Sequence, residues 1–304
     1  MQNGFDGRII AFRAENCDEG VPCGEFLRRM GVSRRLVTKL KRTEMGITRN
    51  GETLRTVDRL RCGDRVELRL EDDKHLEPNS ALRVPVIYED DDVVVFNKPV
   101  GMPVHPSIKH QGDTLGNCFA AMYPKLTFRP VNRLDRDTSG LCAVAKTAHA
   151  ANCLGGTVEK VYIAAVQGVP VPHDIEDTLI KWTTSPEGVY RIDAPIGRAG
   201  ESIIRREVRG DGQSAVTNYT IIKENGRHSL LRITLETGRT HQIRVHFSAL
   251  GYPLAGDDFY GGSLEYCKAQ ALHCGEMSFA RLSDGERVNL LCGIRVDMES
   301  LFWD

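Results

Sequence analysis

Short strand-like runs, joined by loops rather than by regular helices, most constrain how this 304-residue chain can fold. Five such runs lie beyond residue 85, at 93–96, 141–145, 161–166, 230–235 and 288–291. Helical patterns are fewer there, at about 114–122 and 240–250, and the loops are rich in Gly and Pro. A doubly wound parallel sheet requires strands and helices to alternate. We therefore predict an α+β domain with a mixed, mostly antiparallel sheet and flanking helices.

The net charge of −1 hides a separation of charge in the first third of the chain. Residues 28–69 contain thirteen Lys and Arg against five Asp and Glu, a net charge of +8. Residues 71–92 contain eight acidic residues against two basic ones, a net charge of −6. This separation indicates a module that contacts a polyanion and a linker that does not. We expect a small domain at 14–72, a linker at 73–84 and a larger domain at 85–304.

The basic segment has the pattern of two short helices followed by a hairpin. A first helix within residues 24–31 ends at Gly31, and Ser33 caps a second helix. Asn50-Gly51 predicts a two-residue hairpin turn. This pattern resembles the RNA-binding module first described in a ribosomal protein, the S-four-like domain. The alternative is a solvated basic face on a small capping domain. The side chains expected to contact RNA are Arg34, Arg35, Lys39, Lys41 and Arg42.

The stretch NRLDRDTSGL at 132–141 places two arginines, two aspartates and two hydroxyls at the start of an apolar run. One interpretation is an exposed loop whose ion pairs are solvated and contribute little. The other interpretation makes Asp135 an active-site carboxylate. Three more stretches place polar residues beside a strand end or a helix start, at 97–107, 160–168 and 235–261.

The predicted helix at 240–250 contains a charged residue at the edge of its apolar face. Thr240 is the expected cap of this helix, and Arg244 follows one turn later. A guanidinium at that position loses water and requires a carboxylate partner. The candidate partners are Glu236, Asp257 and Asp135. Pairing with Asp135 would hold that carboxylate in its ionised form.

Four motifs in order carry a resemblance to a known family. NKPVGMPVHP, RLDRDTSGL, KVYIAAVQG and GRTHQIRVHFSALGYPLAGDDFYG together resemble the RluA-type pseudouridine synthases, over roughly residues 85–293. The resemblance implies the pseudouridine-synthase α+β fold and the conversion of uridine to pseudouridine in structured RNA. Ribosomal RNA is the expected substrate and transfer RNA the alternative. The reaction needs neither redox chemistry nor external energy, so no cofactor is expected, and the sequence has no phosphate-binding P-loop.

The same resemblance assigns roles to individual residues. Asp135 corresponds to the catalytic aspartate, Tyr162 to the tyrosine that stacks on uracil and helps remove the carbon-five proton, and Arg244 to the arginine that pairs with the aspartate. Arg133 corresponds to the arginine that fills the gap left by the flipped base. Many members have His where this chain has Asn132, which hydrogen-bonds but does not titrate. Further substrate contacts are expected at Asn132, Arg239, His241 and Gln242.

Two other functions remain open at this point. The first is an RNA-binding or ribosome-assembly protein whose synthase domain no longer catalyses. The second is a hydrolase that cleaves a sugar bond with two carboxylates, and it would require Asp137 as the acid beside Asp135.

The remaining composition points to the cytoplasm. Nine cysteines, an odd number without a CxxC pair, indicate reduced thiols. No run of eighteen apolar residues and no signal-peptide pattern are present, so neither a membrane span nor export is expected. Cys267, His273 and Cys274 fit no metal-binding pattern, and no metal is expected. No feature indicates a protein partner, and we expect a monomer.

Overall fold

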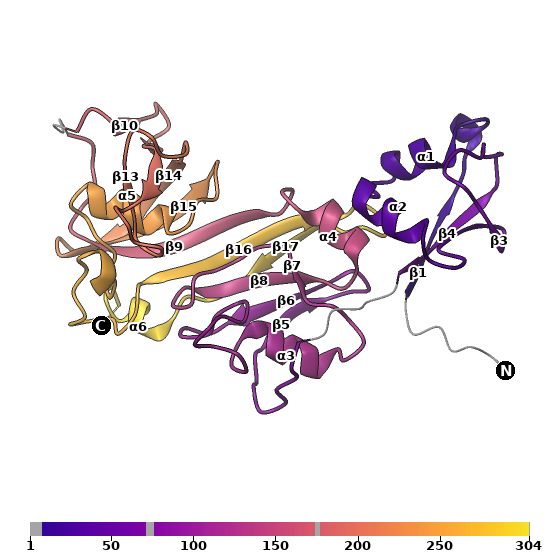
Figure 1. The fold of residues 1–304 in the computed structure, drawn as a ribbon. Helices are drawn as coiled ribbons and strands as arrows, with labels where there is room; N and C mark the ends of the chain where they lie inside the picture. Colours follow the sequence, from indigo (N-terminus) through magenta and orange to yellow (C-terminus); the bar gives the residue numbers. More distant parts are fainter. Residues whose placement is uncertain (1–7, 71–75, 174–176, 304) are drawn as a thin grey trace.

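The computed structural model describes residues 8–70, 76–173 and 177–303. A small N-terminal domain, indigo in Figure 1, lies at one end of the molecule, and a larger domain is built on one long sheet. Residues 76–84 of the expected linker lead into the larger domain, and residues 71–75 lie outside the described part of the chain.

The small domain is a four-stranded sheet in the order β1-β4-β2-β3, packed against two helices. The Ser33 hydroxyl accepts a hydrogen bond from the Leu36 amide at the start of the second helix, as the sequence predicts. Asn50 and Gly51 both have positive φ, 52° and 91°, in the hairpin turn. The first strand lies ahead of residue 14, the expected start of this domain. The elements are β1 (Arg8–Arg13), η1 (Asn16–Asp18), α1 (Cys23–Arg29), α2 (Arg34–Leu40), β2 (Ile47–Arg49), β3 (Glu52–Thr53) and β4 (Arg65–Leu70).

The larger domain contains an eleven-stranded sheet, with nine strands in the order β10-β11-β14-β15-β9-β16-β8-β6-β5. β17 pairs with β16, and β7 pairs with β8. Only the β8–β16 pair is parallel, so the sheet is mixed and mostly antiparallel, as predicted. The strands are β5 (Val86–Glu89), β6 (Val93–Lys98), β7 (Arg129–Pro130), β8 (Ser139–Ala145), β9 (Glu159–Gln167), β10 (Lys181–Thr184), β11 (Tyr190–Asp193), β14 (Val216–Glu224), β15 (His228–Leu235), β16 (Leu272–Ala280) and β17 (Arg287–Leu291).

A separate two-stranded sheet and four helices complete the larger domain. β12 (Ile196–Arg198) and β13 (Arg206–Val208) form a hairpin beside α5 (Gln242–Ala249). α3 (Leu115–Met122) packs Phe119 and its neighbours against β6 and β8, where the main core lies. α4 (Ala148–Leu154) follows β8 and lies next to the small domain (Figure 1). The remaining elements are η2 (Asp258–Tyr260) and α6 (Val296–Glu299).

All five expected strands and both expected helices are present, while several further strands were not expected. β16 escaped notice because Gly275 interrupts its apolar pattern, and the pairing with β9 shifts register between Cys274 and Glu276. β10 to β13 are only three or four residues long, and such short runs are hard to separate from loops by pattern alone.

Candidate active site

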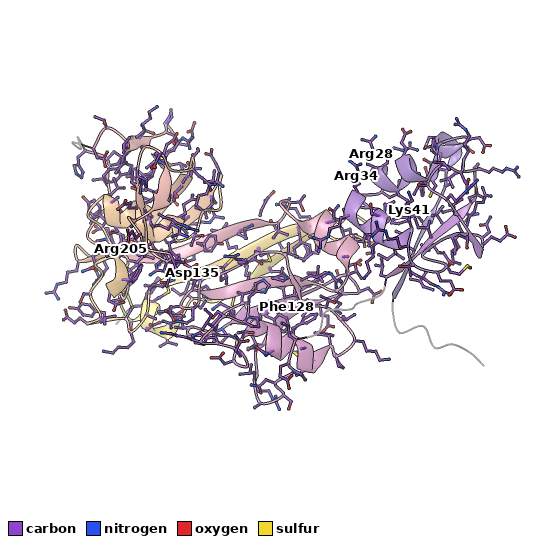
Figure 2. The ribbon with its side chains drawn as sticks, in the orientation of Figure 1. Arg28, Arg34, Lys41, Phe128, Asp135 and Arg205 are labelled. Carbon is purple, nitrogen blue, oxygen red and sulfur yellow. The ribbon has the colours of Figure 1, made fainter. Side chains whose placement is uncertain are left out.

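Asp135 lies on the loop that leads into β8, at the wall of a cleft of about 1070 Å³ (Figure 2). The cleft is bounded by that loop, by the first half of β9 and by the end of β15 with the turn that follows it. About a third of the Asp135 side chain, 31%, is exposed. The carboxylate is therefore reachable from the cleft, as the second interpretation of the 132–141 stretch requires.

A buried lysine fixes the loop that carries Asp135. Lys98, at the end of β6, is 0% exposed, and its ammonium donates to the carbonyl oxygens of Pro99, Met102 and Arg136 at 2.9, 2.7 and 2.9 Å. Burial lowers the pKa of Lys98 to about 8. These bonds join the 97–107 stretch to the residue next to Asp135. Lys98 lies within the NKPVGMPVHP motif, but nothing in the sequence indicates this role.

Arg244 pairs with two aspartates. Its Nε and Nη2 each donate to Asp257 at 2.7 Å, and its Nη1 lies 3.5 Å from Asp135 Oδ2. The Asp257 side chain is 1% exposed and that of Arg244 is 9% exposed. The predicted contact with Asp135 is thus present, but the tighter, bidentate partner is Asp257. The third candidate, Glu236, pairs with Arg191 instead.

Tyr162 lies on β9, opposite Ile233 of β15 and Cys274 of β16. It lines the cleft and also a deeper pocket of about 70 Å³ that it shares with Asp135 and Arg244. Burial, with a smaller contribution from Cys274 and Asp135, raises the pKa of Tyr162 well above its usual value. The phenol is therefore neutral throughout the physiological pH range.

His241 contacts Asp135 from the other side. It precedes α5 in a left-handed conformation with φ 58°, so the N-cap of this helix is His241 and the expected cap, Thr240, is wrong. Its Nε2 lies 3.8 Å from Asp135 Oδ2, and its Nδ1 lies 2.8 Å from the Tyr260 hydroxyl. Burial lowers the pKa of His241, so the ring is neutral near pH 7.

The Tyr260 hydroxyl links this ring to a separate segment of the chain. Its oxygen accepts a hydrogen bond from the Arg206 amide at 3.0 Å and lies 2.8 Å from His241 Nδ1. The other ring nitrogen, His241 Nε2, faces Asp135. The Tyr260 ring also lies against the Arg244 guanidinium, 4.8 Å from ring centroid to Cζ. Sequence reasoning missed Tyr260 because its contacts come from three separate segments.

Two of the expected substrate contacts are occupied by the protein itself. Asn132 is buried, its Oδ1 accepts from the Ala143 amide at 2.8 Å, and its Nδ2 donates to the Leu141 carbonyl at 3.2 Å. Gln242 is also buried and bridges the turn before α5 to β14. Both residues hold backbone in place, while Asn132 also lines the cleft and Gln242 the pocket of about 70 Å³, so direct substrate contact by either residue stays a prediction. Asn serves at position 132 because this role requires hydrogen bonds and no titration.

The other expected contacts face the cleft. Arg133 is exposed and lines both the cleft and the deeper pocket. Arg239 also lines both, and its Nε donates to the Ser214 carbonyl at 2.9 Å. The five basic residues expected to contact RNA are exposed on or just beyond α2, and Figure 2 shows Lys41 well away from Asp135. The catalytic candidates thus lie together, while the basic module lies at the other end of the molecule.

No cluster of three or more His, Cys, Asp or Glu side chains with the geometry of a metal site occurs among the described residues. Within the same residues, none of the helices combines the length and apolar character that crossing a membrane requires.

Comparison with known proteins places this site in context. A family profile described as RNA pseudouridylate synthase matches residues 92–249. An uncharacterized RNA pseudouridine synthase of Bacillus subtilis, YjbO, is 35% identical over 288 residues, which cover 91% of this chain and 96% of that protein. Ribosomal large subunit pseudouridine synthase D of Xanthomonas campestris is 35% identical over 277 residues, 83% of this chain and 78% of that protein. Among solved structures, human RNA pseudouridylate synthase domain containing 1 has a TM-score of 0.56 and 24% identity, covering 75% of this chain and 91% of that chain.

Proposed function

The chain belongs to the RNA pseudouridylate synthase family, and from that membership we propose that it isomerises uridines of ribosomal RNA with Asp135 as its catalytic carboxylate. As a member of this family it is an isomerase that acts on RNA. The observation that carries the assignment of the site is the position of Asp135. Its carboxylate lies at the cleft wall between Arg244 Nη1, at 3.5 Å, and His241 Nε2, at 3.8 Å.

The reaction breaks the bond between uracil N1 and ribose C1′ and forms a bond between C5 and C1′. The proton on C5 leaves, and N1 gains a proton, so atoms and electrons balance without a second reactant. Arg244 places a cation 3.5 Å from the Asp135 carboxylate, a group that suits attack on, or stabilisation of, a cationic sugar carbon. His241 lies beside the same carboxylate, with its Nε2 3.8 Å from Asp135 Oδ2, and its lowered pKa keeps the ring neutral near pH 7.

Tyr162 suits stacking on the freed uracil better than proton removal. Its raised pKa keeps the phenol protonated, and a protonated phenol is a poor base. The C5 proton therefore passes to Asp135, directly or through the Tyr162 hydroxyl. Arg133, exposed at the mouth of the pocket, is positioned to replace the flipped base in its helix.

The substrate class follows from the relatives and from the small domain. Proteins named ribosomal large subunit pseudouridine synthase D are 35–38% identical to this chain over most of its length, which supports large-subunit ribosomal RNA as substrate. The +8 charge of residues 28–69 suits contact with the phosphates of a large RNA. We place the activity in the cytoplasm, where such RNA is found and where the nine free cysteines remain reduced.

The two alternative functions are less well supported. A sugar-bond hydrolase requires a carboxylic acid beside Asp135 that is free to meet the substrate, but the Asp137 carboxylate already accepts three hydrogen bonds of 2.8–3.2 Å from Arg136. A catalytically silent protein has no reason to keep Asp135, Tyr162 and Arg244 in one pocket.

Asp135→Asn tests the proposal directly, with Asp137→Asn as the matched control. Each variant is incubated with ribosomal RNA transcripts, and pseudouridine is detected as a mass-silent base that reacts with carbodiimide. We expect Asp135→Asn to lose all turnover while its RNA affinity stays within a few-fold of wild type, because phosphate contacts elsewhere supply the binding. Asp137→Asn should keep its turnover. Isomerisation by Asp135→Asn, or release of free uracil by wild type, would contradict the assignment.

A further inference from the structure

Helix α4 connects the two domains through contacts that have no part in the chemistry described above. On its small-domain side, Ala148 packs against the small-domain core, and the His149 ring lies edge-on to Phe12 with centroids 5.4 Å apart. Asn152 Nδ2 donates a hydrogen bond to the Gly31 carbonyl. The small domain is thus held by apolar, aromatic and polar contacts from one helix of the catalytic domain.

Gly31 and Cys153 form the tightest point of this contact. A Cβ built on Gly31 would lie 2.8 Å from Cys153 Sγ, and Gly31 has φ +76°, a conformation that other residues adopt at a cost. Glycine therefore satisfies two demands at this position: the turn between α1 and α2, and the close approach of α4. The second demand exists only when the domains are docked.

The docked arrangement places the basic helix near the end of the cleft formed by Gly156 and Thr157, away from Asp135. On the small-domain side, Gly31 is followed within three residues by the basic face of α2, which begins at Arg34. On the catalytic side, α4 is followed directly by Gly156 and Thr157, which line the cleft. Figure 2 shows Arg28 and Arg34 on the part of the small domain nearest the catalytic domain. One short helix thus lies between the basic module and the end of the cleft.

The length and charge of the cleft suit an RNA strand that runs between these points. From Glu159 to Tyr162 the wall is strand and extends for three residue steps, about 10 Å at 3.3 Å per residue, or about three nucleotide steps of a duplex at 3.4 Å per step. Two of its acidic residues are neutralised, since Glu159 pairs with Arg287 and Glu236 with Arg191. The basic residues Arg133, Lys160 and Arg239 also line it.

We propose that docking on α4 makes the cleft and the basic face of α2 one continuous surface for structured RNA, so that the strand flanking the target uridine runs along β9 to the small domain. The inference rests on the proposed function for the identity of the ligand. It goes beyond that function because it makes the position of the small domain, and not only its charge, part of substrate recognition. A small domain on a loose tether would give a lower effective concentration of its binding site.

A disulfide between residue 31 and the native Cys153 tests whether RNA binds the docked form. In Gly31→Cys, the new Cβ lies at nearly the distance that separates a Cβ from the far sulfur of a disulfide, about 3 Å. We expect mild oxidation to close this bond and to leave the affinity for a ribosomal RNA fragment, and its salt dependence, within about twofold of the reduced variant. Gly188→Cys is the control, because Gly188 has a similar φ of +77° and open space around it. Absence of the bond, or loss of RNA binding when it forms, would overturn the inference.

An undocking variant gives the reverse test and does not depend on replacing Gly31. Asn152→Ala with Cys153→Phe removes the hydrogen bond and places a bulky ring against Gly31, while Arg34 and the active site stay unchanged. The Kd for a ribosomal RNA fragment long enough to reach α2 should rise about tenfold, because the small domain is then held near the cleft only by its linker. The kcat on a short hairpin substrate that does not reach α2 should stay unchanged. An unchanged Kd, or a loss of kcat on the hairpin, would overturn the inference. If the proposed function itself were wrong, the wild-type protein would also leave the hairpin unmodified, and this result distinguishes the two failures.

Discussion

Arg244 and the arginines of α2 show how differently one residue type acts in the two regions of this molecule. The side chain of Arg244 is 9% exposed, donates two 2.7 Å hydrogen bonds to Asp257 and reaches Asp135 at 3.5 Å. Arg34 and Arg35 are exposed on a helix surface. A buried charge is stabilising only with the correct partners in place, whereas exposed charges act together through a field that salt screens.

The catalytic site therefore depends on single contacts, whereas the basic module depends on its summed charge. Loss of one partner at the buried site leaves another charge without compensation in a poorly solvated place. Loss of one arginine from α2 removes one of several similar contributions. Four predictions test this contrast.

The largest effect is expected for Arg244→Ala. The Asp257 carboxylate, 1% exposed, would be left buried without its partner, which should cost about 3–5 kcal/mol of unfolding free energy. Turnover should be lost as well, because Asp135 loses its nearest cation. Urea unfolding and the pseudouridine assay measure the two effects.

Arg191→Ala is the matched control for that substitution. Arg191 pairs with Glu236 at 2.9 Å, but the two side chains are 37% and 53% exposed. Removal of such a surface pair should cost less than about 1 kcal/mol. Equal losses from the two substitutions would break the contrast between buried and exposed pairs.

The next effect concerns pH and a histidine two residues beyond Arg244. His246 is buried, its Nδ1 bonds the Thr217 hydroxyl at 2.9 Å and its Nε2 bonds the Ala194 carbonyl at 3.0 Å. Burial lowers its pKa to about 4, so the unfolded chain binds this proton below about pH 6.5 while the folded chain does not. The contribution of His246 to the unfolding free energy is fully present above about pH 6.5. It falls by about 3 kcal/mol as the pH drops toward 4.

His246→Gln isolates this contribution. Glutamine can form hydrogen bonds at the same place but cannot titrate. Between pH 6.5 and 4 the unfolding free energy of this variant should therefore fall less steeply than that of wild type, by about one proton in the linkage slope. Parallel pH profiles of the two proteins would show that His246 is not the group responsible.

A smaller effect is expected for Asp257→Asn. Asparagine keeps the shape and one acceptor oxygen, and Arg244 keeps its contact with Asp135, so the cost should be about 2 kcal/mol. With the negative charge of residue 257 gone, Arg244 is free to move toward Asp135, and we expect a lower kcat with unchanged RNA affinity. Glu236→Gln, at the surface pair, is the control for loss of a carboxylate. A variant with normal kcat would show that Asp257 contributes to stability alone.

Much of this structure could be predicted because its signals are local. The capped helix after Ser33, the hairpin at Asn50-Gly51 and the alternating strands depend on residues a few positions apart. The contact between Arg244 and Asp135 was predicted from a residue-type argument and a family resemblance, and the structure bears it out at 3.5 Å.

The parts that could not be predicted depend on chain segments that meet only in the folded protein. Lys98 binds the Arg136 carbonyl from 38 positions away, and Tyr260 joins Arg206 to His241. The left-handed conformation of His241, which makes this residue and not Thr240 the N-cap of α5, is not indicated by the helix pattern. Asn132 is expected to contact substrate through its family equivalent, and no sequence pattern indicates that its side chain also bonds the backbone of β8.

The smallest effect per residue is expected on α2, where charge acts by addition. Each of Arg34→Gln, Arg35→Gln, Lys41→Gln and Arg42→Gln should change the unfolding free energy by less than about 0.5 kcal/mol, because all four side chains are exposed. Together they should lower the slope of log affinity against log salt by about 0.7 for each phosphate contact that is lost. Arg55→Gln is the control, since Arg55 is 77% exposed and already pairs with Asp58.

The kinetic result of the fourfold variant decides whether the two regions are separate in function. Contacts made by α2 hold the RNA equally in the ground state and the transition state, so their loss should raise KM and leave kcat unchanged. Salt should affect the wild-type KM strongly and the variant KM weakly. The rate at saturating RNA should change neither with salt nor with the fourfold substitution. A fall in kcat on saturating RNA would show that the basic face of α2 also helps to place the target uridine against Asp135. The exposed arginines of α2 would then take part in the geometry of the active site, as Arg244 does.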